Sequence, residues 1–593
     1  MFGDASAPSQ GEFLLLLWKR EDGTCGVAVP LVDGDIRGVL EGTSQGWAIR
    51  AAKLDPLPSL ATLLLVATGP DPLELVLRAM SLVAERLKTF QLRTQKPVPK
   101  WVDYLGWCTW DAFEREVTAE KVLEGLASFQ VGGFGPRFVI LDDGWQDERE
   151  RRLWSFGTQP KRFPQGLKPL IDQARRDYGV KLFGVWHALQ GYWNGVHPGG
   201  ELAEKYPLVE GPDAPGSAPG EPPEKRSMVH PEATGRFLDD YHRTLREQGV
   251  DMVKVDNQGS MDWFATAEVP PTSTVRAYQY GLQDAEKTHF HGESLHCMSN
   301  STDAVYHLRS ANVWRSSQDF FPLKPLTHGL HVFDNAINSL WVQTFALPDW
   351  DMFQSNHYAG AFHAAARAIS GGPVYVSDKP DGHDFKLLAK LVVSDGTVLR
   401  CEQPALPGRE NLFEDGRAEP CVTKITNFNR VAGLQSPIGV LGLFNCYFSN
   451  GEPAPVLGEY SAADVPGIRA DQFALFHHGS GRVLLAEQGT RFPIKLEGLG
   501  FELVTVSPVE NGVALFGLID KFNSSRGVES ARWVSPGELE VELRDGGRLG
   551  WFSAKATLKA QFNDAPLEVS SKENLTWVRM PEGNRATVRL RFG

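Results

Sequence analysis

The stretch DMVKVDNQGS, residues 251–260, has the pattern of a buried strand that ends in charged and polar side chains. Its apolar residues are interrupted by Lys254 and Asp256. Side chains two residues apart on a strand point to the same face, so we expect Lys254 and Asp256 to project together from one side of a sheet. The pair is either a salt bridge that stabilises the strand end or part of a functional site.

Seven further segments of this kind occur between residues 105 and 378, each apolar at its start and polar or aromatic at its end. The eight segments are 105–110, 137–145, 180–188, 251–257, 289–300, 312–320, 346–353 and 373–378. Helical patterns separate several of them, at 119–129, 167–176, 235–247 and 358–369. Alternating strands and helices indicate a parallel sheet, and eight such units predict a (β/α)8 TIM barrel with its active site at the carboxyl ends of the strands.

The sequence on each side of this region has short strands separated by Gly, Asp and Pro turns. We therefore predict a multidomain α/β plus β protein, in which antiparallel β domains flank the barrel. The expected domains are an N-terminal β-sandwich-like domain over residues 1–96, a catalytic barrel over 97–400 and a C-terminal antiparallel β domain over 401–593. The Pro/Gly-rich segment 197–232 is expected to be a long surface loop of the barrel.

The overall composition excludes some classes of partner. The net charge of −13 argues against a nucleic-acid-binding protein, which would need a basic surface. No apolar run is long enough for a signal peptide or a membrane span. The six cysteines are scattered without a CxxC motif, which is typical of reduced thiols. These features predict a cytoplasmic protein without a nucleic-acid or membrane partner, whose oligomeric state stays open.

Two of the predicted strand ends carry residues suited to acid–base chemistry. The fourth segment presents Lys254 and Asp256, and the sixth, VWRSSQDFF, presents Arg315 and Asp319 on one face. Two carboxylates on non-adjacent strands can face each other across a ligand, as retaining glycoside hydrolysis requires. Lys254 would favour the ionised form of a nucleophilic Asp256. Because a cation opposes an acid role for Asp319, Arg315 is expected to point at a sugar hydroxyl or at another carboxylate.

The other strand ends are rich in carboxylates and indoles. Asp142 and Asp143 end the second segment, and Asp351 lies in the seventh. The nearby tryptophans are Trp107, Trp110, Trp145, Trp186, Trp193 and Trp350. Carboxylates and cations bind hydroxyl groups and indoles cover apolar sugar faces, so the set suits a neutral polyol, although any single tryptophan is as readily a core residue. A divalent metal is the competing use of an acidic rim. The chain has no compact metal-ligand motif and no complete nucleotide-binding fingerprint, so we expect no metal and no cofactor.

Six motifs carry a resemblance to a known family: GWCTWDAF, LDDGWQ, VKVDNQ, RSSQDF, PDWDMFQS and HAAARAISGGPVYVSD. In this order, over residues 105–378, they resemble the raffinose synthase, seed-imbibition and alkaline α-galactosidase group of glycoside hydrolase family 36. The resemblance implies a retaining mechanism through a covalent galactosyl-aspartate, with Asp256 as nucleophile and Asp319 as acid/base. It also implies that these residues line the sugar subsite: Trp107, Asp142, Asp143, Trp186, Lys254, Cys297, Arg315 and Asp351.

The resemblance leaves more than one function open. The favoured one is an α-galactosidase that hydrolyses terminal α-galactosyl residues, because plant synthases of the group carry more sequence between Asp319 and Trp350. A raffinose-synthase-like galactosyltransferase would use the same intermediate but pass it to a sugar hydroxyl instead of water. A retaining glycosidase for another α-linked sugar would keep the fold and the mechanism. A non-catalytic sugar-binding protein is disfavoured because both aspartates are present.

One departure from the family bears on the acid/base. Many relatives have an acidic residue where this chain has Gln318. If Gln318 rather than Asp319 occupied the acid/base position, catalysis would be crippled. The spacing from Arg315 and the alternation along the strand both favour Asp319.

Overall fold

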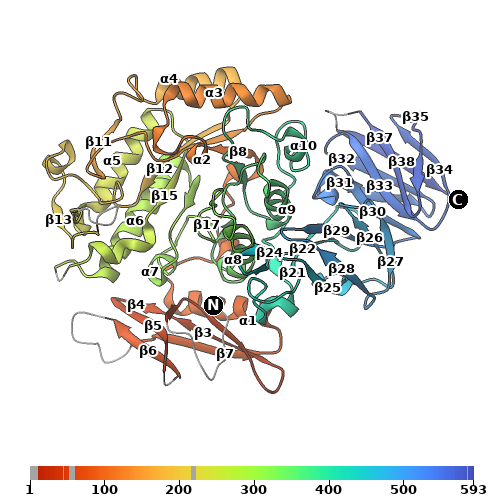
Figure 1. Ribbon diagram of the computed structural model, residues 1–593, viewed down its shortest axis with the longest axis horizontal. Coiled ribbons are helices and arrows are strands. Elements are labelled where there is room, and N and C mark those ends of the chain that lie inside the picture. The colour runs from red at the N-terminus through yellow and green to blue at the C-terminus, as the bar shows by residue number, and fades with distance from the viewer. Residues whose placement is uncertain are drawn as a thin grey trace.

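The computed structural model describes residues 11–44, 46–52, 61–215, 222–266, 268–581, 583 and 585–593. The first ten residues of the predicted N-terminal domain and the middle of the segment 197–232 lie outside the described residues. In Figure 1 a central region of strands and helices has one set of sheets at its N-terminal side, drawn in red, and another at its C-terminal side, drawn in blue.

The central sheet consists of eight parallel strands, each short and buried. They are β8 (Leu105–Cys108), β9 (Phe138–Leu141), β12 (Leu182–Ala188), β15 (Met252–Asp256), β16 (Ser294–His296), β17 (Val313–Arg315), β18 (Leu347–Asp349) and β19 (Val374–Val376). The hydrogen-bonded order is β18-β17-β16-β15-β12-β9-β8-β19. A parallel bridge between Phe353, just after β18, and Val376 of β19 closes the ring. The predicted TIM barrel is confirmed.

A helix follows each barrel strand along the chain. They are α3 (Ala119–Phe129), α4 (Lys168–Tyr178), α5 (Thr234–Glu247), α6 (Pro271–Phe290), α7 (Thr302–Val305), α8 (Thr327–Val342), α9 (Gly360–Ser370) and α10 (Phe385–Leu388). Helix α3 shows why its sequence is helical: the Thr118 side chain caps the amide of Lys121, and Val122, Leu126 and Phe129 form the buried face. Helices α6 and α8 were not among the predicted helices.

Two hairpins extend the loops at the carboxyl ends of the strands. After β9, β10 (Gln146–Arg149) pairs with β11 (Arg152–Thr158). After β12, β13 (Leu208–Glu210) pairs with β14 (Ser227–Val229) inside the segment 197–232. The predicted surface loop therefore contains two short paired strands, and the second of them buries Met228 and Val229.

Among its described residues, the N-terminal region has two antiparallel sheets and one α-helix. The strands are β1 (Gly11–Phe13), β2 (Leu16–Lys19), β3 (Cys25–Pro30), β4 (Val32–Asp33), β5 (Ile36–Thr43), β6 (Gly46–Ala52) and β7 (Leu64–Gly69), and the helix is α1 (Pro72–Leu87). Asp71 caps α1 by accepting hydrogen bonds from its first amides. Residues of β3 and α1 share one hydrophobic core with Leu340 and Trp341 of α8, so this region packs directly on the barrel wall.

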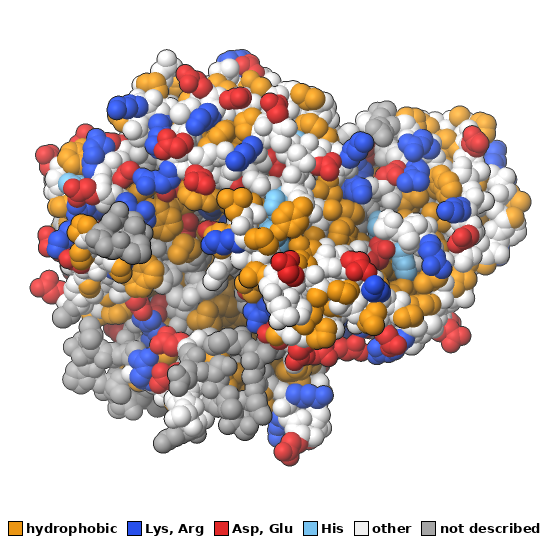
Figure 2. All heavy atoms as spheres, viewed as in Figure 1, with side chains coloured by type: hydrophobic (Ala, Val, Ile, Leu, Met, Phe, Trp, Pro, Cys, Tyr) orange, Lys and Arg blue, Asp and Glu red, His pale blue; other side chains and the backbone are white. Residues whose placement is uncertain are grey.

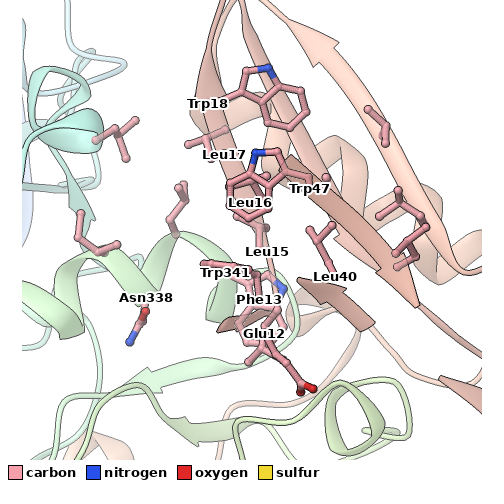
Figure 3. A pocket seen from close by; sticks show the side chains of 18 of the residues that line it. Glu12, Phe13, Leu15, Leu16, Leu17, Trp18, Leu40, Trp47, Asn338 and Trp341 are labelled. Carbon is pink, nitrogen blue, oxygen red and sulfur yellow. The ribbon is translucent and has the colours of Figure 1, made fainter. Parts of the chain in front are cut away.

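An apolar cavity of about 890 Å³ lies between the N-terminal sheets and helix α8. Figure 3 shows Trp18, Trp47 and Trp341 around it. None of the predicted site residues lines this cavity, so it is separate from the strand ends that carry the chemistry.

The C-terminal region is built from antiparallel sheets. The largest sheet has the order β20-β21-β22-β29-β26-β27, and two others have the orders β30-β33-β37-β36 and β31-β32-β38-β34-β35. Their strands are β20 (Leu406–Pro407), β21 (Thr423–Asn429), β22 (Ile438–Phe444), β26 (Phe473–His477), β27 (Val483–Ala486), β29 (Phe501–Pro508), β30 (Val513–Leu518), β31 (Val528–Ser535), β32 (Glu538–Leu543), β33 (Gly547–Ser553), β34 (Thr557–Phe562), β35 (Ala565–Pro566), β36 (Ser570–Lys572), β37 (Leu575–Met580) and β38 (Ala586–Phe592). The predicted fold class, a barrel between antiparallel β regions, is confirmed. The exact domain boundaries stay predictions.

Within the described residues, no helix has the length and apolar character needed to cross a membrane. All six cysteines are free thiols. On the face seen in Figure 2, acidic and basic side chains are interspersed rather than gathered in one charged field.

Trp107 lies on the helix side of β8. Its indole packs against Gly125 of α3 and makes edge contacts with Phe113 and Phe129. A methyl group on Gly125 would lie 2.2 Å from the indole, so the glycine makes the room that this tryptophan occupies. Because neighbouring residues on a strand alternate, Cys108 faces the opposite side.

We expect Gly125→Ala to destabilise the protein although alanine is the better helix former. The added methyl group must displace the buried indole, at a cost of about 1–3 kcal/mol. Gly235→Ala in α5 is the matched control, because a methyl group there would have no neighbour within 4 Å. That control should be neutral or stabilising by up to about 1 kcal/mol. Thermal or urea unfolding of both variants tests this, and equal stability of the two would contradict the packing described.

Candidate active site

A buried ion pair forms the floor of the site. The Nζ of Lys254 on β15 donates to Oδ2 of Asp142 at 2.7 Å, and each side chain is 4% exposed. The Cys108 thiol donates to the same oxygen at 3.2 Å. Burial lowers the pKa of Lys254, but Asp142 and smaller contributions from Cys108 and Cys297 together hold that pKa well above its ordinary value. The lysine is therefore a fixed positive charge, although its direct partner is Asp142 and not Asp256 as expected.

Asp256, at the end of β15, has one donor on each carboxylate oxygen. The Trp186 indole donates to Oδ2 at 2.9 Å, and the backbone amide of Asn257 donates to Oδ1 at 2.6 Å. Asn257 has a φ of +60°, which turns the chain sharply at the strand end. Burial raises the pKa of Asp256, an effect that the Lys254 charge and these two hydrogen bonds oppose and that the charge of Asp319 reinforces.

Asp143 is held by two residues that the sequence did not single out as ligands of a carboxylate. The Tyr192 hydroxyl donates to Oδ1 at 2.6 Å and the Trp193 indole donates to Oδ2 at 3.0 Å. Burial raises the pKa of Asp143, and these hydrogen bonds oppose that rise. Trp193 also lies beside Trp186, with ring centroids 5.4 Å apart. Two indoles thus form part of the wall above the Lys254–Asp142 pair.

Arg315, at the end of β17, binds three carboxylates from the buried side of the site. Its Nε contacts Asp349 at 2.9 Å, its Nη2 contacts Asp351 at 2.6 Å, and its Nη1 contacts Asp319 at 3.0 Å. The expectation that Arg315 would point at another carboxylate is met by the first two contacts. The same expectation excluded Asp319 and is wrong there. The turn after β17 brings Asp319, four residues after Arg315, back to the guanidinium.

Asp319 is the most open of these acidic groups. Its side chain is 41% exposed, whereas Asp349 and Asp351 are fully buried. The neighbouring Gln318 is exposed. The contact with Arg315 is made by Asp319, and the assignment of Asp319 rather than Gln318 as the acid/base stays a prediction.

Asp351 anchors the loop that carries Asp319. It has a φ of +67°, and its carboxylate accepts a hydrogen bond from the amide of Phe320 at 2.7 Å. The Phe320 ring is surrounded by four histidine rings, those of His328, His331, His357 and His363. The position of Asp319 is thus set by its buried neighbour in the chain.

Two further groups complete the site. Cys297 follows β16 and is fully buried, and burial raises the pKa of its thiol well above the ordinary value, so it is a neutral group. Asp111, in the short helix α2 (Trp110–Phe113) after β8, accepts a hydrogen bond from the Ser377 hydroxyl at 2.6 Å. Asp111 stands in the GWCTWDAF motif but is not among the predicted site residues.

The structure brings nine of the ten predicted site residues to one end of the barrel. These are Asp142, Asp143, Trp186, Lys254, Asp256, Cys297, Arg315, Asp319 and Asp351. Trp107 lies instead between β8 and α3, because Cys108 takes the inward position. Across the part of the chain that the structure describes, no group of three or more His, Cys, Asp or Glu is placed to hold a metal ion.

The arrangement combines one buried carboxylate, Asp256, with one exposed carboxylate, Asp319, close enough for the second to raise the pKa of the first. Around them lie fixed charges and neutral hydrogen-bonding groups of the kind that bind a polyol. Such a pair can perform covalent catalysis at an acetal carbon, with one group as nucleophile and the other as acid/base.

Comparison with known proteins identifies the relatives of the chain. A protein of Arabidopsis thaliana described as "Probable galactinol–sucrose galactosyltransferase 6" is 32% identical, over 93% of this chain and 81% of its own length. The galactinol–sucrose galactosyltransferase of Oryza sativa subsp. japonica is 31% identical, over 93% and 80%. The stachyose synthase of Pisum sativum is 26% identical, over 84% and 75%.

Solved structures are more distant. A GH27 β-L-arabinopyranosidase from Geobacillus stearothermophilus has a TM-score of 0.47 and 16% identity, over 69% of this chain and 97% of that one. An α-galactosidase from Thermus thermophilus in complex with stachyose has a TM-score of 0.45 and 17% identity, over 62% and 76%.

The family described as raffinose synthase or seed imbibition protein Sip1 matches residues 18–154, 156–451 and 458–580, which is nearly the whole chain. The match extends over the barrel and both flanking β regions, whereas the resemblance seen in the sequence motifs was confined to the barrel. The chain belongs to the raffinose synthase and seed imbibition protein family.

Proposed function

We propose that the protein is a retaining enzyme that transfers α-galactosyl groups. Asp256 attacks C1 of an α-galactoside while Asp319 protonates the departing oxygen, so that a galactosyl-Asp256 ester forms. Asp319 then removes a proton from the hydroxyl group of a second sugar, which attacks C1 and releases Asp256. The observation that carries the proposal is the contrast between the two carboxylates, one buried with a donor on each oxygen and the other 41% exposed.

The surroundings of Asp256 and the exposure of Asp319 support the two roles. A nucleophile must be ionised, and Lys254, Trp186 and the Asn257 amide all favour the ionised form of Asp256. An acid/base must exchange protons with incoming and departing groups, for which the exposure of Asp319 is suited. The fixed Arg315 charge beside Asp319 is available to a substrate hydroxyl, which would then replace part of the contact between the two side chains.

The relatives shift the preference from hydrolysis to transfer. Those named above are described as galactosyltransferases or as a stachyose synthase, which supports a sugar hydroxyl as the acceptor. Hydrolysis by the same intermediate remains the second candidate, because the exposed Asp319 side chain is also open to water. The two outcomes differ only in which molecule attacks the galactosyl ester.

We expect Asp256→Ala to lose turnover of an aryl α-galactoside by at least about 10³-fold, because no other group forms the ester. Sodium azide should restore part of the activity and yield a β-galactosyl azide, since the small anion enters the space of the missing carboxylate. Product analysis by mass spectrometry and NMR tests this. Full activity of the variant, or an α-configured azide, would remove Asp256 as the nucleophile.

We expect Asp319→Ala to slow substrates with poor leaving groups by about 10²–10⁴-fold, and activated aryl galactosides far less, because only the former need a proton on the departing oxygen. Gln318→Ala is the matched control from the adjacent exposed position and should change both classes by less than about twofold. Parallel measurements of kcat/KM on the two substrate classes test the assignment. An equal loss on both classes for Asp319→Ala would show that Asp319 is not the acid.

The choice between transfer and hydrolysis follows from the products of the wild-type protein. Proton NMR of an aryl α-galactoside reaction, with and without sucrose, should show an α-configured galactosyl product first and a new α-galactoside that grows with the sucrose concentration. Free galactose unaffected by sucrose would favour hydrolysis, and a β-configured first product would contradict the retaining mechanism.

A further inference from the structure

Asp111 lies across the site from the proposed reacting pair. It follows β8, and its Oδ2 accepts a hydrogen bond at 2.6 Å from Ser377, which follows β19. In the closed ring of eight strands, β8 is opposite β16. Strand β16 stands between β15, which carries Asp256, and β17, which precedes Asp319. A ligand whose reacting carbon lies between these two carboxylates therefore has its far end toward Asp111.

The carboxylates nearby already have strong partners. Asp142 has Lys254 and a thiol, Asp143 has a phenol and an indole, and Asp349 and Asp351 share Arg315. Each of them is held by a cation or by at least two donors, so their oxygens are largely occupied.

Asp111 is different. Among the described residues, its side chain has one hydrogen-bond donor, the neutral Ser377 hydroxyl on Oδ2. Burial, reinforced by the charges of Asp351, Asp142 and Asp319, raises its pKa to about 7. Such a pKa is typical of a half-buried carboxyl group without a cationic partner. The oxygen Oδ1 thus keeps hydrogen-bonding capacity that a ligand hydroxyl can use.

We propose that Asp111 binds a hydroxyl group at the end of the galactosyl ring remote from C1, the 6- or the 4-hydroxyl, and so helps to select the glycone. This inference rests on the proposed function, since it takes C1 to lie between Asp256 and Asp319. Ser377 holds Oδ2 and thereby orients the carboxyl group, and Oδ1 meets the sugar. The Lys254–Asp142 pair forms the floor of the same subsite, and Asp111 closes it from the β8 side.

The test compares the wild type with Asp111→Asn and Asp111→Ala on aryl α-galactoside and on its 6-deoxy and 4-deoxy analogues. On the parent substrate kcat/KM should fall by about 10- to 100-fold in Asp111→Ala. The fall should be much smaller on the one analogue that lacks the hydroxyl Asp111 binds, because the wild type cannot make that bond either. A 6-deoxy substrate that is spared assigns the 6-hydroxyl, and a 4-deoxy substrate that is spared assigns the 4-hydroxyl.

Ser377→Ala is the matched control, because it loosens the same carboxyl group without removing it. Its loss should be smaller than that of Asp111→Ala on the parent substrate. Equal losses on all three substrates in both Asp111 variants would show that Asp111 only ties two loops together, and no loss would show that it does not touch the sugar. Either result overturns the inference while the activity of the wild type upholds the proposed function. Should Asp111→Ala fail to fold, Asp111→Leu, which has no hydrogen-bonding atom in its side chain, provides the same comparison. A wild type inactive on all three substrates would overturn both the inference and the proposed function.

Discussion

The salt bridge between Lys254 and Asp142 is the contact on which the chemistry of this barrel end depends. Both side chains are 4% exposed, and a buried charge without a partner is strongly destabilising. The pair joins β15 to the end of β9 and leaves a fixed positive charge below Asp256. Burial raises the pKa of Asp256, and the Lys254 charge opposes that rise. Without this cation the neutral form of Asp256 would be favoured, and a neutral Asp256 could not act as a nucleophile.

Arg315 has the corresponding role at the other side of the site. Fully buried, it neutralises Asp349 and Asp351, and Asp351 in turn holds the loop that carries Asp319 through the amide of Phe320. The two cations thus have a shared consequence: many acidic groups can gather at one end of a barrel, and each still has its own environment. In the proposed mechanism Asp256 is the buried member of the reacting pair and Asp319 the exposed one, and this difference in environment would separate nucleophile from acid.

Strand ends and periodicity in the sequence predicted the barrel and the bounds of α3, and together with the family resemblance they predicted nine of the ten site residues at one rim. They did not predict α8, because THGLHVFDNAINSLWV contains weak helix formers and is buried on most sides, so no amphipathic stripe appears. The alternation along VKVD placed Lys254 on the correct face but could not tell Asp142 from Asp256 as its partner, since that depends on the neighbouring strand. Asp111 likewise gains its place only when the ring closes and Ser377 comes beside it.

In the proposed mechanism water and a sugar hydroxyl attack the same galactosyl ester with help from the same Asp319, so the residues at the floor of the site would serve both reactions equally. Selectivity between them has to arise where the acceptor lies, beyond the strand ends. The elements that extend there include the hairpins β10–β11 and β13–β14. Trp193 lies between the two hairpins along the chain, and the Arg151 guanidinium is 5.8 Å from the centre of its ring. The Trp193 indole is thus held by a cation over its ring and by the hydrogen bond that its nitrogen donates to Asp143, which makes it a rigid platform. We therefore expect substitutions in these loops to change which acceptor is used, while the Lys254–Asp142 and Arg315 contacts stay intact.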